Sequence, residues 1–417
     1  MKIQSIPKYL SPTASRLLAD KTFDIEFRGY LSNHSKHAIV ALERLNASEQ
    51  RLEEYWNEYT HMTPYNIQLH KIDQDWENVE PATFQQWKSW RGKKINWQEQ
   101  VSFVDRRLQS KHNGDMESLL SELAPDLLTS ASLAGSLTHG IIHLGWGVDA
   151  GSTCMITEGL AYLNFCALGV EPSYIKMDSF PDESTPIESM VRIAKTWKDE
   201  HLQQTWVQRA KSAYDNPEKF HPELVVAGFQ WELAKVLEHA HPVATEIPSW
   251  MTRMEISELY EHLYRMVTWL YLASRDSTEN GNFLVLHLLT SLWGLEHVLR
   301  AVDKEPSLKH SLTRTALAQW FANMIAIVAT SSGGFPSVTV LESIQKEIAE
   351  SKTDPCDLDW SSVVERGIAE VEEHNIKLVY VTRELWKRYG QWHGYYKAAN
   401  AFVLTPNIGP DTPEYDA

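Results

Sequence analysis

Apolar residues recur along most of this 417-residue chain at the three- and four-residue spacing of an amphipathic α-helix, and strand-like alternation is weak everywhere. This pattern favours an all-α fold, built as a large multi-helix bundle. The predicted helices cover 37–59 (a pair broken at 46–48), 96–110, 116–128, 131–148, 154–168, 187–214, 222–238, 256–275, 280–302, 310–331, 338–351 and 360–388. Without internal repeats, we expect one helical domain over 1–404 and a proline-containing tail over 405–417.

Composition and charge exclude several classes of protein. The formal net charge is -16 at pH 7, which argues against a nucleic-acid partner because phosphates need a basic face. Cys154, Cys166 and Cys356 are far apart, so we predict neither a disulfide framework nor a thiolate zinc site. The chain has no apolar run long enough for a membrane span and starts without a secretory signal, so we expect a cytoplasmic protein.

The segment THGIIHLGWG carries two histidines at helical spacing. His139 and His143 are four residues apart, which puts both imidazoles on one side of a helix at a distance that can chelate one ion. Glycines crowd the same segment and cost helix stability, so a close approach of another helix or a ligand is expected there. The alternative is two buried histidines bonded to backbone or water.

Two further segments place histidines on apolar faces. In SNHSKHAIVAL, His34 and His37 share a face at a helix start, where capping of the helix is the alternative role. In FLVLHLLTSLWGL, His287 lies inside an apolar stretch, and a buried imidazole without a partner costs about 1–3 kcal/mol. A satisfied core histidine is the alternative reading of His287.

Near the C-terminus, EEHNIKLVYV contains an inward-facing lysine. His374 and Lys377 lie three residues apart on a stripe that also holds Gly367 and Val371. Burial disfavours the charged form of a lysine and lowers its pKa. A neutral amine can take up carbon dioxide to form a carbamate, an anionic oxygen ligand for a metal. The alternatives are snorkelling to the surface and a salt bridge to a nearby glutamate.

These signals share one economical explanation. Six histidines and one lysine face inward from four separated segments, and one bound metal would account for all of them. We therefore expect the bundle to enclose a central metal site. Imidazole-rich coordination suits zinc, iron, copper or nickel and does not choose among them.

The same segments carry a resemblance to a known family. In the order SNHSKHAIVAL, THGIIHLGWGVDAGSTCMITEGLAYL, FLVLHLLTSLWGL and EEHNIKLVYV, they are similar to the questin-oxidase-like family of fungal and bacterial enzymes. The similarity spans roughly residues 28–385. Its combination of HxxIHLG, EGLAYL and a C-terminal HxxK is fairly specific.

The resemblance implies an activity and a ligand set. Members cleave a ring carbon–carbon bond of anthraquinones and related polyketides, and they include a fungal non-haem iron dioxygenase whose iron is held by four histidines and a carboxylated lysine. Lys377 matches that lysine, and His143, His287 and His374 match histidine ligands and catalytic positions. The fourth ligand comes from His37 or His139, with His34 as a further candidate.

Trp293 and the stretch after the HLG motif depart from the family pattern. Trp293 stands where some members have a second histidine, so we predict an aromatic wall in place of a ligand. A more acidic stretch often follows the HLG motif, and here only Asp149 remains as a partner that could orient an imidazole. Glu158 is either such a partner or a helix-packing residue.

The function implied by the resemblance is a non-haem Fe(II)-dependent dioxygenase in fungal polyketide secondary metabolism. It would use O2 as co-substrate, a CO2-derived carbamate on Lys377 and a small aromatic substrate. One rival is an NADPH-dependent Baeyer–Villiger monooxygenase, against which the chain shows no GxGxxG after a strand. A metal hydrolase and a non-catalytic helical scaffold are the others. The oligomeric state is left open by the sequence.

Overall fold

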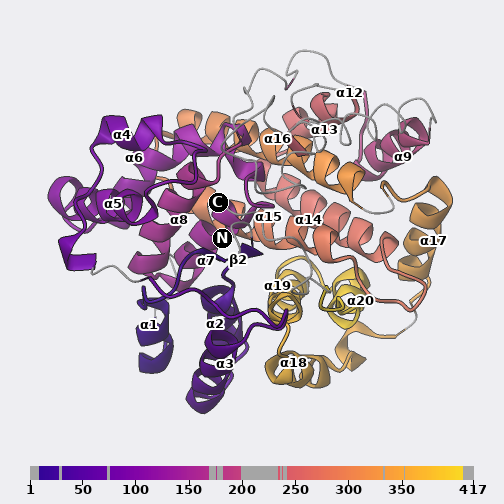
Figure 1. Ribbon diagram of the computed structural model, residues 1–417. Helices are drawn as coiled ribbons and strands as arrows, with labels where there is room; N and C mark the ends of the chain where they lie inside the picture. Colours follow the sequence, from indigo (N-terminus) through magenta and orange to yellow (C-terminus); the bar gives the residue numbers. More distant parts are fainter. Residues whose placement is uncertain are drawn as a thin grey trace, which may run out of the picture.

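The computed structural model describes residues 9–27, 31–72, 76–168, 175, 182–198, 233–234, 237, 242–331, 334–351 and 353–406. Helices dominate these residues, and the strands among them form one short antiparallel pair (Figure 1). The predicted all-α class is therefore confirmed. No helix in the described part of the chain is long and apolar enough to cross a membrane.

The elements have the following bounds: α1 Pro12–Leu18, β1 Glu26–Phe27, β2 Leu31–Ser32, α2 Ser35–Arg44, α3 Glu49–His61, α4 Phe84–Ser89, α5 Trp97–His112, α6 Met116–Leu128, α7 His139–Ala150, α8 Thr153–Phe165, α9 Pro186–Trp197, α12 Pro242–Thr245, α13 Ser249–Arg253, α14 Ile256–Ala273, α15 Phe283–Ala301, α16 Pro306–Thr330, α17 Val338–Ala349, α18 Trp360–Ala369, α19 Glu373–Arg388 and α20 His393–Asn400. Short 3-10 turns cover Trp76–Asn78, Ala131–Ala134 and Pro355–Asp357.

Most predicted helices are present with shifted ends. The helix predicted over 116–128 has those bounds as α6, and the pair predicted over 37–59 is α2 and α3, with Ser48 capping α3 as its polar break suggested. The helix predicted over 187–214 is described only as far as α9 and Lys198, and most of 222–238 lies outside the described residues. The helices α1, α12, α13 and α20 were missed.

The single helix predicted over 131–148 is wrong. A 3-10 turn over Ala131–Ala134 is followed by Ser136, Leu137 and Thr138, which have φ values of 46°, 50° and 67°, and only then does α7 begin at His139. Left-handed backbone costs a residue with a side chain roughly 1–2 kcal/mol. The break places His139 at the start of α7 instead of inside a longer helix.

The single helix predicted over 360–388 is also wrong. The chain leaves α18 after Ala369, and Glu372 caps α19 by accepting hydrogen bonds from the backbone N–H groups of His374 and Asn375. Val371 lies in this break and is 56% exposed, so it does not continue the inward stripe. His374 and Lys377 are nevertheless fully buried, as predicted.

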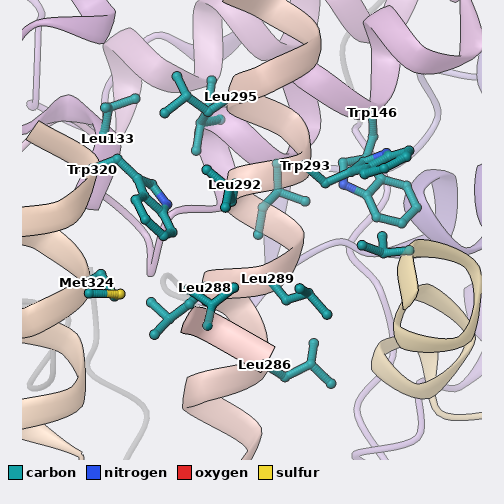
Figure 2. Packing of buried hydrophobic residues seen from close by; sticks show 14 of the residues in the cluster. Leu133, Trp146, Leu286, Leu288, Leu289, Leu292, Trp293, Leu295, Trp320 and Met324 are labelled. Carbon is teal, nitrogen blue, oxygen red and sulfur yellow. The ribbon is translucent and has the colours of Figure 1, made fainter. Parts of the chain in front are cut away.

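A hydrophobic core surrounds the middle of α15. Figure 2 shows the leucines of this helix spread around its axis, with Trp320 and Met324 of α16 on one side and Trp146 of α7 on the other. The helices α7 and α15 cross at Gly145 and Gly294, where a Cβ atom on Gly145 would lie 2.1 Å from the Cα atom of Gly294. The glycine-rich segment thus serves the close helix approach that its sequence indicated.

This crossing brings the beginnings of four helices together. The helix α2 packs on α7 and α19, and α15 packs on the same two helices. His34 precedes the first turn of α2, His139 opens α7, His287 lies near the start of α15 and His374 near the start of α19. The histidines of four distant segments therefore lie side by side inside the bundle.

Candidate metal centre

The predicted histidines form one buried cluster. The ring centroids of His34 lie 4.5 Å from those of both His139 and His374, and the centroid of His287 lies 4.8 Å from those of His139 and His374. None of these four rings is more than 6% exposed. They form a closed ring of imidazoles, donated by four different helix starts.

Two of these imidazoles have a fixed orientation and a free lone pair. The Nδ1–H of His287 donates to the carbonyl oxygen of Phe283 at 2.8 Å, and the Nδ1–H of His139 donates to the carbonyl oxygen of Ser136. A neutral imidazole that donates through one nitrogen carries a lone pair on the other. The Nε2 atom of His139 is buried and has no hydrogen-bond partner among the described residues. Both Nε2 atoms are therefore available as ligands.

His374 completes this group with a partner that the sequence analysis missed. Its Nδ1 atom lies 2.7 Å from Oε1 of Glu372, and its Nε2 atom lies 3.1 Å from Nε2 of His287. Burial raises the pKa of Glu372, which suits a proton shared along the row Glu372–His374–His287 in the absence of a cation. A metal ion between the two Nε2 atoms would replace that proton.

The spacing of these nitrogens suits a single ion. Two imidazole nitrogens that bind one metal at about 2.1 Å and at a right angle lie about 3 Å apart, close to the 3.1 Å between His287 and His374. Nitrogen atoms of His34, His139 and His374 also lie within 4.8 Å of one another. The donor set is therefore chemically and geometrically able to hold a transition metal.

Lys377 lies at the edge of the same group. Its Nζ atom is 2.7 Å from Nδ1 of His34, and the side chain is completely buried. Because the side chain is buried, Lys377 does not snorkel to the surface. Among the described residues no carboxylate lies within ion-pair distance of its Nζ atom, so the salt-bridge alternative is absent there as well. Burial lowers the pKa of Lys377 to about 8, against the opposing effect of Glu373 and Glu372.

The neutral form of the imidazoles is favoured throughout. Burial is the main cause that lowers the pKa of each of the four histidines, and the neighbouring Lys377 lowers it further. For His287 the pKa falls to about 3. A neutral imidazole is the form that binds metals, so the site keeps its ligands ready at neutral pH.

His37 and His143 lie in a second row beside this group. Nε2 of His37 lies 3.0 Å from Nδ1 of His143, and Nε2 of His143 lies 3.1 Å from Oε2 of Glu158. Both ring nitrogens of His143 thus have partners, whereas Nδ1 of His37 is buried without one. The sequence left two roles open for Glu158, and the structure shows it as an imidazole partner. Nζ of Lys36 lies 2.7 Å from both of its carboxylate oxygens.

One interpretation made from the sequence changes. Asp149 orients none of the imidazoles that the structure describes, because its Oδ2 atom accepts hydrogen bonds from Nε1 of Trp293 and the hydroxyl of Tyr380. The ring of Trp293 packs in the core against Tyr380 at 5.6 Å, so its role as an aromatic wall stays a prediction. The signal that could have found Glu372 is its position directly before a helix start, where acidic caps are common.

Comparison with known proteins identifies the family. The family model described as questin oxidase-like matches residues 31–382, which is most of the chain and contains every member of the cluster. The protein belongs to the questin oxidase-like family. A search of curated proteins found no match.

Proposed function

We propose that this protein is a non-haem Fe(II)-dependent dioxygenase that cleaves a ring carbon–carbon bond of an anthraquinone in fungal polyketide metabolism. The observation that supports it most is the ring of neutral imidazoles whose lone pairs converge beside a buried lysine. Membership of the questin oxidase-like family supports the oxygenase class and the quinone substrate.

The proposed ligands are His34, His139, His287 and His374, together with a carbamate on Lys377. This set differs from the one that the family resemblance suggested, because both nitrogens of His143 already have partners. His143 as a ligand stays a prediction that the iron measurements below test directly.

Lys377 is suited to carry the carbamate. The neutral amine attacks carbon dioxide, a nitrogen–carbon bond forms, and one proton leaves to solvent. A pKa of about 8 leaves part of the amine neutral near pH 7. The positive ends of four helix dipoles meet here, which favours the anionic carbamate over the ammonium form.

The bound iron would supply the position at which dioxygen is activated. The protein would hold the imidazoles by hydrogen bonds from Nδ1, which fix the tautomers of His139 and His287 through backbone carbonyls. Phe283, whose ring centroid lies 4.5 Å from that of His374, adds an aromatic face beside the cluster. The buried surroundings would exclude water and position a flat substrate near the ligands.

The decisive experiment is the metal content of anaerobically purified protein. We expect about one iron per chain in the wild type, loss of iron in Lys377→Ala and His374→Ala, and retention of iron in His143→Ala. His262→Ala, in which the lost imidazole comes from the exposed side of α14, is the matched control and should keep its iron. Labelled dioxygen and a hydroxyanthraquinone then test ring cleavage.

Three outcomes would contradict the proposal. Metal-free wild type that oxidises the quinone with NADPH would favour the monooxygenase. Zinc in place of iron, with no uptake of labelled oxygen, would favour the hydrolase. Full iron content in both Lys377→Ala and His374→Ala would mean that the cluster does not hold the metal.

A further inference from the structure

A row of four side chains leads from Lys36 into the histidine cluster. Nζ of Lys36 lies 2.7 Å from both carboxylate oxygens of Glu158, which then contacts His143, which in turn contacts His37. The row crosses three helices, α2, α8 and α7, and ends at Nδ1 of His37. That nitrogen is buried, and no residue that the structure describes forms a hydrogen bond with it.

Hydrogen-bond chemistry fixes the direction of every bond in this row. The ammonium of Lys36 keeps Glu158 ionised, and a carboxylate only accepts hydrogen bonds. His143 must therefore donate through Nε2–H, so its Nδ1 atom carries the lone pair. His37 must then donate to that lone pair through its own Nε2–H. Its Nδ1 atom is left as a hydrogen-bond acceptor.

The surroundings of His37 place this acceptor beside the proposed metal centre. The ring centroid of His37 lies 5.4 Å from that of His34, and positive charge on Lys377 or His139 would act on it directly. A buried acceptor without a partner costs free energy unless a ligand supplies a donor. A hydroxyl group that a bound ligand directs at this nitrogen would supply such a donor.

We propose that Lys36 and Glu158 lock the tautomers of His143 and His37, so that Nδ1 of His37 accepts a hydrogen bond from a hydroxyl group of the aromatic substrate. This makes His37 a residue that selects hydroxylated quinones, and it makes His143, Glu158 and Lys36 positioning residues. The substrate class rests on the proposed function, but the tautomer lock does not.

Glu158→Gln weakens the lock without removing any side chain. Both carboxylate oxygens of Glu158 contact Nζ of Lys36, so a neutral amide in this place can present either its oxygen or its N–H group to Nε2 of His143. Where the N–H group faces His143, it donates to Nε2, His143 donates through Nδ1–H, His37 accepts through Nε2, and Nδ1 of His37 becomes a donor. The variant keeps the packing and no longer fixes Nδ1 of His37 as an acceptor.

The first measurement is the nitrogen NMR spectrum of the full-length protein with labelled imidazoles, assigned with His37→Gln and His143→Gln. In the wild type both rings should be Nε2–H tautomers, and in Glu158→Gln the Nδ1–H tautomers should become populated. A wild-type His37 protonated at Nδ1 would overturn the proposal.

The second measurement compares the binding of a dihydroxyanthraquinone sulfonate with that of the anthraquinone sulfonate that lacks hydroxyls, by quenching of tryptophan fluorescence. The wild type should prefer the hydroxylated probe by about ten-fold, the weight of one hydrogen bond. Glu158→Gln should lose that preference. Glu296→Gln, which changes another buried ion-paired carboxylate away from the cluster, should keep it. Equal preference in the wild type and Glu158→Gln would contradict the role of the lock.

Iron content, measured on the same samples, separates this inference from the proposed function. His37→Phe should retain iron and lose the preference for the hydroxylated probe. Loss of iron in His37→Phe would make His37 a ligand and overturn its role toward the substrate. Wild-type protein without iron would count against the proposed function, while the NMR result would still test the lock.

Discussion

The two halves of α15 differ in whether the protein itself supplies partners for their buried polar groups. In the second half, Glu296 accepts hydrogen bonds from the hydroxyl of Tyr264 at 2.6 Å and from Arg388 at 3.0 Å, and Arg300 pairs with it as well. In the first half, Nδ1–H of His287 donates to a backbone carbonyl, so its Nε2 atom carries a lone pair. That lone pair faces Nε2 of His374, which is a second imidazole nitrogen and no dedicated donor. The second half, which we call the paired half, has partners for Glu296 within the protein. The first half, which we call the histidine half, needs a proton or a cation between His287 and His374.

We infer that the pairing of Glu296 contributes to stability, whereas the lone pair of His287 contributes to ligand binding. Buried polar groups in folded proteins nearly always have partners, so a group of converging lone pairs calls for a specific explanation. A bound ion is the explanation that covers all four imidazoles at once. The two halves should therefore respond differently to acid, to helix separation and to substitution.

Acid should produce the largest effect, and it should act on the histidine half first. Burial lowers the pKa of six histidines in the cluster and in the row beside it (His34, His37, His139, His143, His287 and His374) below the usual 6.5, so the unfolded chain binds protons before the folded one. Their contribution to stability is complete above pH 6.5 and is lost as the pH falls below it. Each histidine removes up to about 1.4 kcal/mol per pH unit.

Three carboxyls modify this acid response. The pKa of Glu372 and that of Glu373 are raised by burial, which has the opposite sign, but two carboxyls oppose six histidines. The pKa of Glu296 is lowered, so the paired half loses stability only as the pH falls below about 4.5. Urea unfolding of chelator-treated protein between about pH 7 and pH 5 should show a loss of several kcal/mol. A flat profile would contradict the neutral cluster.

Gly145→Ala should have the next largest effect, because it forces α7 away from α15. Its Cβ atom would lie 2.1 Å from backbone atoms of Gly294, which cannot move without separating α7 from α15. We expect a loss of about 3 kcal/mol in the free energy of unfolding and a loss of bound metal. The nearest atoms to a Cβ atom on Gly367 belong to the side chain of Val379, at 3.1 Å, so Gly367→Ala should change stability by less than about 1 kcal/mol. Equal effects would mean that the crossing is not tight.

A pair of substitutions on α15 should produce the smallest effects and test the comparison directly. Glu296→Gln should cost about 2 kcal/mol of stability and leave the metal content unchanged, because it weakens the pairing with two arginines. His287→Leu should abolish metal binding but change the stability of the metal-free protein by less than about 1 kcal/mol. Denaturant unfolding and metal analysis check both. A large stability loss in His287→Leu would mark the ring as an ordinary core residue.

Local signals in the chain were sufficient for much of the fold. The helix α6 has the predicted bounds because Asp115 caps its start and the apolar spacing continues up to Leu128. The burial of His374 and Lys377 was predictable, since apolar residues at helical spacing surround them in the sequence. Both results depend on interactions within a few residues, which the sequence displays directly.

Long-range contacts decided what the sequence could not display. Ser136, Leu137 and Thr138 adopt left-handed backbone although none is glycine, and the hydroxyl of Ser136 bonds a carboxylate oxygen of Glu26, far away in the chain. That turn delays the start of the predicted helix until His139 and directs the ring of His139 into the cluster. Residue types alone give no sign of such a turn, because its strain is offset by tertiary contacts.

The sequence by itself determined the helical class, the family and the list of histidines and the lysine that face inward. Only the tertiary structure decided which of them meet, because a ring nitrogen is a ligand or a hydrogen-bond donor according to the partner of its other nitrogen. His143, with Glu158 and His37 on its two nitrogens, and His139, with one nitrogen on a carbonyl and the other free, are four residues apart. Their spacing is that of a chelating pair, and their packing gives them different chemistry.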